Sequence, residues 1–283
     1  MMNTGAGKAM EQTKVKSKME NNKSSAHILV LGNEKGGTGK STLAMHLVVG
    51  LMDNGKKVAV IDLDARQKSI ARYIENRQAY MQREGKILQL PLVSVVEQSQ
   101  AKVTSQRQEE DQANMQAALD NVSQQVDFIV IDCPGNDTYL SRLAHALADT
   151  LVTPLNDSFV DLDLIGEVSA TDYQVKKLSY YSEMVWDSRK FRSASGQAPM
   201  DWVIVRNRLA SLDSKNNKRV HRALEALQKR IMFRYVPGLY ERVIYKELFP
   251  SGLTILDLPK TKSLSNVAAR QELRSLIDNL KLL

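Results

Sequence analysis

The sequence predicts an α/β fold, a mostly parallel twisted sheet with helices on both of its faces. Three observations lead to this prediction. Short, continuously apolar segments recur along the chain, and such segments are typical of strands that are buried on both sides. Segments with helical character separate them, which is the order that a parallel sheet requires. A glycine-rich turn joins the first of these strands to the first helix.

The predicted elements follow one another in a regular order. The segment "HILVLGN" (residues 27–33) is short, apolar and ends in glycine, and we expect a buried strand. The segment "STLAMHLVVGLMDNGK" (41–56) is apolar for longer and reaches Asn54 and Gly55, a typical helix end. Further buried strands are expected at "KVAVIDLD" (57–64), "VDFIVIDCPG" (126–135), "DTLVTPLN" (149–156), "DWVIVRNR" (201–208) and "FRYVPGL" (233–239).

The last segment, "LSNVAARQELRSLIDNLKLL" (264–283), is predicted to be an amphipathic helix. Leu273, Leu276, Ile277 and Leu280 lie at the spacing of one apolar face. The polar side carries charges of both signs, whereas a helix that lies on a membrane is more basic and more aromatic. We therefore expect this helix to pack against the body of the protein, with no stable membrane anchor.

Composition narrows the class of protein. The chain has 283 residues, of which 43% are hydrophobic and 25% charged, so it can bury a large core in one or two domains. No apolar segment approaches the roughly 20 residues that span a bilayer, and the N-terminus lacks the apolar core of a signal peptide. The lone Cys133 excludes a disulfide framework and a multi-cysteine cluster within one chain. We expect a cytoplasmic protein.

The positive charge is concentrated in two regions of a chain whose net charge is +7. Residues 1–25 are polar and contain five lysines and two glutamates. We interpret them as a disordered basic tail before a single domain at 26–283, with residues 94–125 as an exposed loop and helix of that domain. Residues 202–246 contain eleven lysines and arginines against three acidic residues, which favours a face that binds a polyanion.

The glycine-rich turn lies in "LGNEKGGTGKST" (31–42) and follows the pattern of a phosphate-binding loop. Its glycines let backbone N–H groups turn toward phosphate oxygens, and the helix that follows adds its positive end. We expect nucleotide phosphates to contact Gly36, Gly37, Thr38 and Gly39. A structural turn with a chance lysine is the alternative, and the flanking strand and helix argue against it.

The residues that end the loop add side-chain chemistry. Lys40 is expected to bridge the β- and γ-phosphates, Ser41 to bind Mg²⁺ and Thr42 to bond the α-phosphate. Asp132 ends an apolar strand, as a carboxylate that holds Mg²⁺ through water does. A capping aspartate in a turn is the alternative. Gly135, in the turn that follows, is placed to reach the γ-phosphate.

Two aspartates alternate at the end of the strand in "AVIDLDARQ" (59–67). A carboxylate close to a γ-phosphate is unfavourable unless it contacts the metal or the attacking water. We therefore assign Asp64 to the positioning of that water, against the alternative of an ordinary solvated aspartate. The role of Asp62 stays open: it either supports the site residues from behind or is purely structural.

The segments "KGGTGKST", "DLDARQ" and "DCPG" resemble the deviant Walker A motif and the switches of the ParA/MinD superfamily of P-loop ATPases. Glu34 departs from the general phosphate-loop pattern but not from the deviant one, which is defined by a signature lysine. By this resemblance the signature lysine is Lys35, and it reaches across a homodimer interface to the ATP of the partner. A solvated loop lysine is the plain alternative.

The resemblance narrows to the MipZ-type ATPases that position the division site, and it runs from about His27 to the end of the chain. It implies an Mg-ATP-dependent ATPase that dimerises and hydrolyses ATP slowly, as a regulatory step. It also implies that the protein acts with a ParB-like protein and inhibits FtsZ assembly near the poles, associated with the nucleoid. Six segments carry it: "GNEKGGTGKST", "AVIDLDARQKS", "NDSFVDLD", "DWVIVRNRLA", "RVIYKELFPSGLTILDL" and "AARQELR".

Three alternative functions remain open. A ParA-like partition ATPase would bind the nucleoid without acting on FtsZ. A MinD-like regulator of division would associate with the membrane. A metabolic enzyme of the same superfamily, such as an amidoligase or an iron–sulfur reductase, is the third, although the lone Cys133 argues against the reductase.

Two residues are expected near the adenine base. Asn207 follows a strand, and in the superfamily an asparagine at this place reads the edge of adenine, with one donor and one acceptor. A turn asparagine is the alternative. Pro237, which precedes Gly238, is expected to form the other wall of the base pocket.

The basic region is expected to bind DNA without sequence specificity. The segment "NNKRVHRALEALQKR" (216–230) is helical and mostly positive, and no base-reading motif is evident. Contacts to phosphates weaken steeply with salt, and a dimer would double them. A solvated helix flank is the alternative. The candidate DNA-binding residues are Arg206, Arg208, Lys218, Arg219, Arg222, Arg230 and Arg242.

Overall fold

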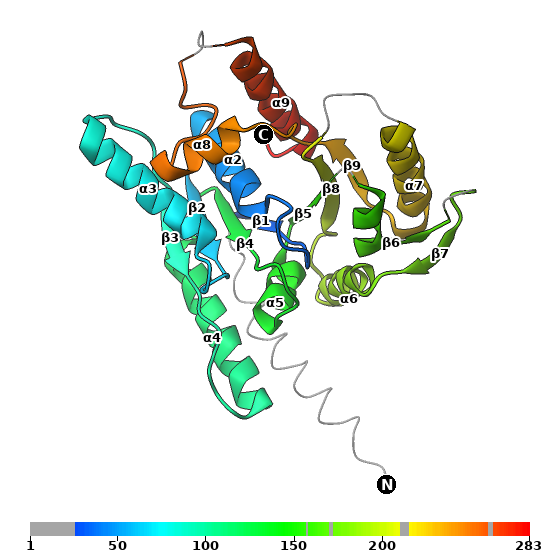
Figure 1. The fold of residues 1–283 in the computed structure, drawn as a ribbon. Coiled ribbons are helices and arrows are strands. Elements are labelled where there is room, and N and C mark those ends of the chain that lie inside the picture. Colours follow the sequence, from blue (N-terminus) through cyan, green and yellow to red (C-terminus); the bar gives the residue numbers. More distant parts are fainter. Residues whose placement is uncertain (1–25, 157, 170–171, 210–214, 260–262) are drawn as a thin grey trace.

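Parallel strands form the main sheet of the computed structural model, which describes residues 26–156, 158–169, 172–209, 215–259 and 263–283 (Figure 1). The predicted tail at 1–25 lies outside the described residues. The strand order is β3-β2-β4-β1-β5-β8-β9, and β6 and β7 form a separate antiparallel hairpin. The strands are β1 His27–Leu31, β2 Val58–Asp62, β3 Leu92–Val95, β4 Phe128–Asp132, β5 Thr150–Asn156, β6 Gly166–Val168, β7 Val175–Leu178, β8 Asp201–Asn207 and β9 Arg234–Pro237.

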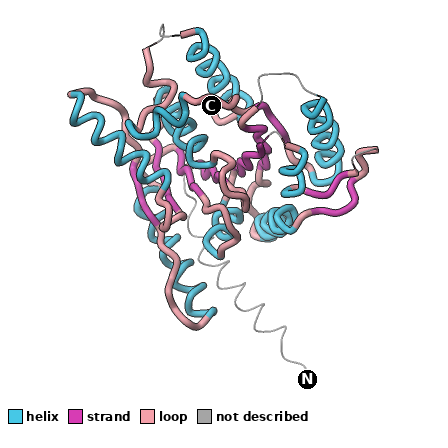
Figure 2. Tube along the Cα trace, in the orientation of Figure 1, coloured by secondary structure: helices cyan, strands magenta, loops and turns pink. Residues whose placement is uncertain are grey.

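Helices cover both faces of the sheet (Figure 2). One hydrophobic core joins α2, α3 and α9 to one face, and a second core joins α4, α5, α6 and α7 to the other. Because successive side chains of a strand point to opposite faces, Leu29 belongs to the first core and Ile28 to the second. The helices are α2 Lys40–Asp53, α3 Ser69–Glu84, α4 Thr104–Val122, α5 Tyr139–Leu147, α6 Tyr180–Ala194, α7 Lys215–Ile231, α8 Ile244–Leu248 and α9 Leu264–Leu280, with 3₁₀ turns η1 Phe159–Leu164 and η2 Phe249–Ser251.

The predicted fold class is confirmed, with the six expected strands and the four expected helices (α2, α4, α7 and α9) in place. Sequence patterns missed β3, whose Leu92, Val93 and Val95 are each about 40% exposed at the edge of the sheet. They also missed the hairpin of β6 and β7. An edge strand lacks the continuous burial that marks a central strand of a parallel sheet, so its sequence carries a weaker signal.

The register of the strands brings the polar residues to one edge of the sheet. Asp132 of β4 pairs with Asp62 of β2 on one side and with Leu31 of β1 on the other. In β5 and β8, Asn156 pairs with Asn207. The carboxyl ends of parallel strands share an edge, so the glycine-rich loop after β1 lies beside both aspartates. This edge is where open α/β sheets bind their ligands.

A buried polar network holds the start of the loop. The Tyr181 hydroxyl donates to the Gly32 carbonyl at 2.9 Å and lies 2.9 Å from the Thr153 hydroxyl. His145 Nε2 lies 3.1 Å from the same tyrosine oxygen, and Trp202 Nε1 donates to Thr153 at 3.0 Å. A Cβ on Gly32 would lie 2.4 Å from His145 Nε2, so only glycine fits where β1 passes this network.

The C-terminal helix α9 packs against the body, as its apolar spacing predicts. Leu273, Leu276, Ile277 and Leu280 are each at most 3% exposed, and all belong to the core that α2 shares. Arg270 donates through Nη2 to the Ile255 carbonyl at 3.1 Å. Among the described residues, no helix is long and apolar enough to cross a membrane.

His46 of α2 is a packed core residue, as its apolar neighbours in the sequence predict. It is fully buried, Nδ1 donates to the Thr42 carbonyl at 2.8 Å, and Nε2 accepts from the Ile255 N–H at 3.3 Å. Burial lowers its pKa to about 4. The unfolded chain therefore takes up a proton near pH 6.5 that the folded chain does not, and stability falls as the pH drops between these values.

We expect the free energy of unfolding to lose about 1.4 kcal/mol per pH unit from His46 alone between about pH 6.5 and 4. Urea denaturation at about pH 7 and pH 4.5 measures this loss. His46→Gln, which does not titrate here, should show a shallower pH dependence than wild type. Equal pH dependence in the two proteins would refute the assignment.

Candidate functional site

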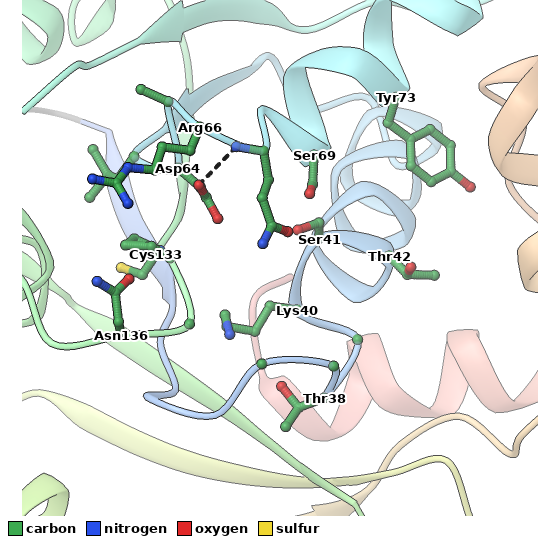
Figure 3. A pocket seen from close by; sticks show the side chains of 18 of the residues that line it. Thr38, Lys40, Ser41, Thr42, Asp64, Arg66, Ser69, Tyr73, Cys133 and Asn136 are labelled. Carbon is green, nitrogen blue, oxygen red and sulfur yellow. Dashed lines mark hydrogen bonds between the residues drawn. The ribbon is translucent and has the colours of Figure 1, made fainter.

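A cavity of about 730 Å³ opens at the carboxyl edge of the sheet (Figure 3). Its wall includes the loop at residues 36–42, the turn at 63–67 after β2 and the turn at 133–136 after β4. The sequence predicted all three segments for the site. It did not predict the part of the wall formed by Tyr73, Glu97, Gln98, Gln100 and Phe249.

The loop has the shape that phosphate binding requires. Gly37 and Gly39 adopt φ angles of 75° and 85°, in the left-handed region that favours glycine. Asn33 fixes the first half, because its Nδ2 donates to the Pro154 carbonyl at 2.5 Å and its Oδ1 accepts from the Lys35 N–H at 2.6 Å. These contacts fix the backbone of the loop that leads into α2.

Lys40 lies across the floor of the loop. Its Nζ donates to the Lys35 carbonyl at 3.1 Å, and the residue is only 8% exposed. Burial lowers the pKa of this ammonium group, and the nearby Asp132 carboxylate opposes the shift. A buried cation with one carbonyl partner favours an anion in the cavity. The bridge from Lys40 to β- and γ-phosphates stays a prediction.

Asp132 and Ser41 form the part of the site that suits a metal ion. Asp132 is 1% exposed, and its Oδ1 has no hydrogen-bond partner among the described residues. Burial raises its pKa to about 7, against the effect of a hydrogen bond from Ser41. The described residues contain no cluster of three His, Cys, Asp or Glu ligands. Mg²⁺ takes most of its ligands from water and phosphate, so this sparse pair fits Mg²⁺.

The turn after β2 is organised by Asp62. Its two oxygens accept from the Asp64 N–H at 2.9 Å and from the Ala71 N–H at 3.1 Å, and it is fully buried. The structure therefore supports the structural role that the sequence had left open for Asp62. Asp64 is half-buried, lines the cavity and accepts from the Gln67 N–H at 3.0 Å (Figure 3). Its contact with an attacking water stays a prediction.

The turn after β4 approaches the loop closely. A Cβ on Gly135 would lie 3.1 Å from the Gly36 Cα, so the two turns pack backbone against backbone. Gly135 lines the cavity, as its predicted contact with the γ-phosphate requires. A larger side chain at position 135 would therefore collide with the loop backbone.

Lys35 points away from the cavity wall in the single chain. Its ammonium group forms an ion pair with Asp161 of η1, whose side chain is only 6% exposed. Residues 36–42 line the cavity, and Lys35 is not among the lining residues. Sequence reasoning missed Asp161, because a partner 126 positions away leaves no local signal. The contact of Lys35 with a second protomer stays a prediction.

The predicted base-pocket residues lie behind the loop. Asn207 is 5% exposed, donates to the Thr38 carbonyl at 2.9 Å and accepts from the Leu239 N–H at 3.4 Å. Neither Asn207 nor Pro237 is among the residues that line the cavity. In this structure Asn207 links the loop to Leu239 through these two hydrogen bonds. Both contacts with adenine stay predictions.

The predicted DNA-binding residues come from several elements of the fold. On α7, Lys218, Arg219, Arg222 and Arg230 are exposed, as is the neighbouring Lys229. The apolar side of this helix packs into the core. Their DNA contacts stay predictions, but they form a coherent basic surface on one helix.

The other three candidates lie on other elements. Arg206 is half-buried at the end of β8. Burial raises the pKa of Tyr235 of β9, and Arg206 is close enough to oppose this rise; Tyr235 in turn contacts His221 of α7 at 3.0 Å. Arg208 lines the cavity. Arg242 forms an ion pair with Glu272 of α9, and its Nη1 donates to the Ser265 hydroxyl at 3.1 Å.

A family model and two curated relatives match this chain, and all three are described as ATPases or proteins of septum placement and chromosome partitioning. A family model described as ATPase MipZ matches residues 27–283. The chain is 27% identical over 177 residues to the septum site-determining protein MinD of Helicobacter pylori, covering 54% of this chain and 62% of that protein. It is 24% identical over 168 residues to the chromosome partitioning protein ParA of Myxococcus xanthus, covering 53% and 59%. The matches thus span less than two thirds of either relative.

The fold is also similar to solved structures. The ATP complex of a variant of McdA from Cyanothece superposes with a TM-score of 0.58 at 17% identity, covering 90% of this chain and 96% of that one. The cell division ATPase MinD of Pyrococcus furiosus superposes with a TM-score of 0.54 at 18% identity, covering 90% and 99%. At this level of identity the likeness shows the fold alone.

We expect Asp132→Asn to stabilise the ligand-free protein. The pKa of Asp132 is raised to about 7, so ionisation destabilises the native state increasingly as the pH rises toward that value. The variant should gain roughly 3 kcal/mol at about pH 8 and much less at about pH 5. Urea denaturation at both pH values measures the gain, with Asp187→Asn on an exposed face of α6 as the control. A destabilised variant at the higher pH would contradict this account.

Proposed function

Because this chain belongs to the ATPase MipZ family, we propose that it is an Mg²⁺-dependent ATPase that forms a homodimer when ATP is bound. One observation carries the proposal: the loop, Ser41 and Asp64 meet at one cavity beside Asp132, while Lys35 next to them is held outside it. The first group suits nucleotide binding and hydrolysis. Lys35, whose ammonium group lies outside the cavity, is a cation that could contact the phosphates of another protomer if it left Asp161.

The loop and four nearby side chains each have a defined task in this proposal. Backbone N–H groups of the loop and Lys40 bind the phosphates and offset their charge. Ser41 and Asp132 would hold Mg²⁺, which would supply further charge neutralisation. Asp64 accepts a hydrogen bond from the attacking water and orients it toward the γ-phosphate. Hydrolysis is slow in the free protomer, because Lys35 is paired with Asp161 instead of the phosphates.

Dimerisation would bring the missing cation. Lys35 and the loop lie beside exposed Gly36 and Gly37, so a second protomer can approach the phosphates from this side. In the dimer each Lys35 would leave Asp161 and contact the phosphates of the other protomer. ATP occupancy is thereby converted into association, and hydrolysis returns the protein to monomers.

DNA binding is proposed for the exposed cations of α7. A dimer presents two copies of this helix, so modest affinity for phosphates in each copy adds up to stable binding. The apolar face of α7 is committed to the core through Val220, Leu224 and Leu227. Its charged face is exposed, where it can follow a DNA backbone without reading bases.

By family membership we further propose a role in positioning the division site. The protein would act with a ParB-like partner, inhibit FtsZ assembly and concentrate on the nucleoid near the poles. A ParA-like partition function is the alternative, and FtsZ sedimentation with and without ATP separates the two. Undisturbed FtsZ polymers would favour partition. Flotation with liposomes and ATP tests the MinD-like alternative.

We expect Lys35→Ala to bind ATP and remain monomeric, because its charge is needed only across the interface. Asp161→Asn should dimerise at roughly thirtyfold lower protein concentration, since each dimer no longer gives up two competing ion pairs, each worth about 1 kcal/mol. Sedimentation velocity with a non-hydrolysable ATP analogue measures both. A dimer of Lys35→Ala would end the cross-protomer role.

We expect charge reversal at Arg219 and Arg222 to lower DNA affinity more than about tenfold and to reduce the salt dependence of binding. ATP binding should be unchanged, because neither residue lines the cavity. Fluorescence anisotropy with labelled DNA and the ATP analogue measures the effect. The matched control reverses Arg83 and Lys86, which are exposed near the end of α3. Equal losses in both double variants would contradict a DNA-binding face on α7.

A further inference from the structure

Arg66 is a cation of the cavity wall that the proposed mechanism has not used. The described residues that line the cavity include the cations Lys40, Arg66 and Arg208 and the acidic residues Asp64 and Glu97. Lys35 is held outside by Asp161. A nucleoside triphosphate carries more negative charge than one lysine and one Mg²⁺ neutralise. A further cation at the phosphates would therefore strengthen nucleotide binding in a single protomer.

The turn after β2 fixes Arg66 next to Asp64. This turn is closed by the Lys68 N–H, which donates to the Asp64 carbonyl at 2.6 Å, and by the Gln67 N–H on the Asp64 carboxylate. Asp62 anchors it from below. In Figure 3 the guanidinium of Arg66 lies toward the turn that carries Cys133 and Asn136. Arg66 is thus placed with the residue that we assign to the attacking water.

Arg66 is also uncommitted. It is exposed, and it forms no hydrogen bond or ion pair with another described residue. Its neighbour Lys68 differs, because its ammonium group lies 3.6 Å from Glu97. Arg208 also lines the cavity. It follows Asn207, which lies against the loop at Gly39, because a Cβ on Gly39 would be 2.8 Å from Asn207 Nδ2. Of the two arginines, Arg66 shares its turn with Asp64, the residue that we assign to the water beside the terminal phosphate.

A positive charge at this place also resolves an electrostatic conflict. The Asp64 carboxylate and a γ-phosphate repel each other when they share a cavity. A guanidinium group offers several N–H donors in a fixed fork that matches phosphate oxygens. Placed on the same turn, it offsets the repulsion and binds the phosphate at the same time. It also faces the charge that grows on the phosphoryl oxygens during transfer.

We propose that Arg66 binds the terminal phosphate of the nucleotide in its own protomer and so distinguishes a triphosphate from a diphosphate. This inference rests on the proposed nucleotide site. The contact of Arg66 with the terminal phosphate would hold the turn after β2 against ATP, and hydrolysis would remove this contact. Lys35 then acts as the second added cation, supplied only by the dimer.

The test uses single protomers, so that contacts across an interface do not contribute. In a Lys35→Ala background, titration calorimetry measures the dissociation constants of a non-hydrolysable ATP analogue and of ADP, both with Mg²⁺. Arg66→Gln should weaken the analogue by about ten- to a hundredfold and ADP by less than about threefold, as the loss of a charged hydrogen bond predicts. Arg66→Lys should fall between. The matched control Lys68→Gln, on the same turn, should change neither constant.

Each other result overturns the inference in a distinguishable way. Equal weakening of both nucleotides, or no change, would show that Arg66 does not read the terminal phosphate. An effect seen only when Lys35 is intact and dimers form would place Arg66 in the interface instead. If the Lys35→Ala protein binds neither nucleotide while it is folded, the proposed nucleotide site itself fails.

Discussion

The site depends on the glycine-rich loop after β1, whose backbone is fixed by hydrogen bonds from side chains of several elements. A loop rich in glycine loses much conformational entropy when it is ordered, so it needs partners on every side. Tyr181 supplies one at the Gly32 carbonyl, Asn33 supplies two, and Asn207 holds the Thr38 carbonyl. These anchors come from β5, α6 and β8 and their surroundings, which explains why a small site needs the whole sheet.

Burial at this edge separates the charges of the site into two groups. Asp132 and Lys40 are kept where water cannot stabilise them, and their pKa values shift toward the neutral forms. Such groups destabilise the empty protein and gain from a charged ligand. Lys35 is different, because Asp161 already satisfies it. Asp132 and Lys40 thus favour the binding of Mg²⁺ and phosphate. Lys35, the cation that a dimer would use, stays paired with Asp161.

Sequence patterns predicted the local parts of this picture well. The central strands, α2, α7, α9 and the loop each leave a periodic or motif signal within a short window. The contacts that set the site left no such signal. Asp161 meets Lys35 from 126 positions away, and Asn207 serves the loop from 169 positions away. Arg242 looked like part of a basic face, but the partner that neutralises it, Glu272, lies on α9. Long-range packing, not residue type, decides these roles.

The central claim is that Lys35 acts on the nucleotide of a second protomer. Mixing two impaired variants tests it directly, by measuring phosphate release from Lys35→Ala and Asp64→Ala proteins, alone and together. In a mixed dimer, the site of the Lys35→Ala protomer keeps its own Asp64 and receives Lys35 from the other chain. We expect only slow or no phosphate release from either variant alone and much faster release from the mixture. A mixture no faster than its components, with mixed dimers confirmed by sedimentation, would contradict the claim.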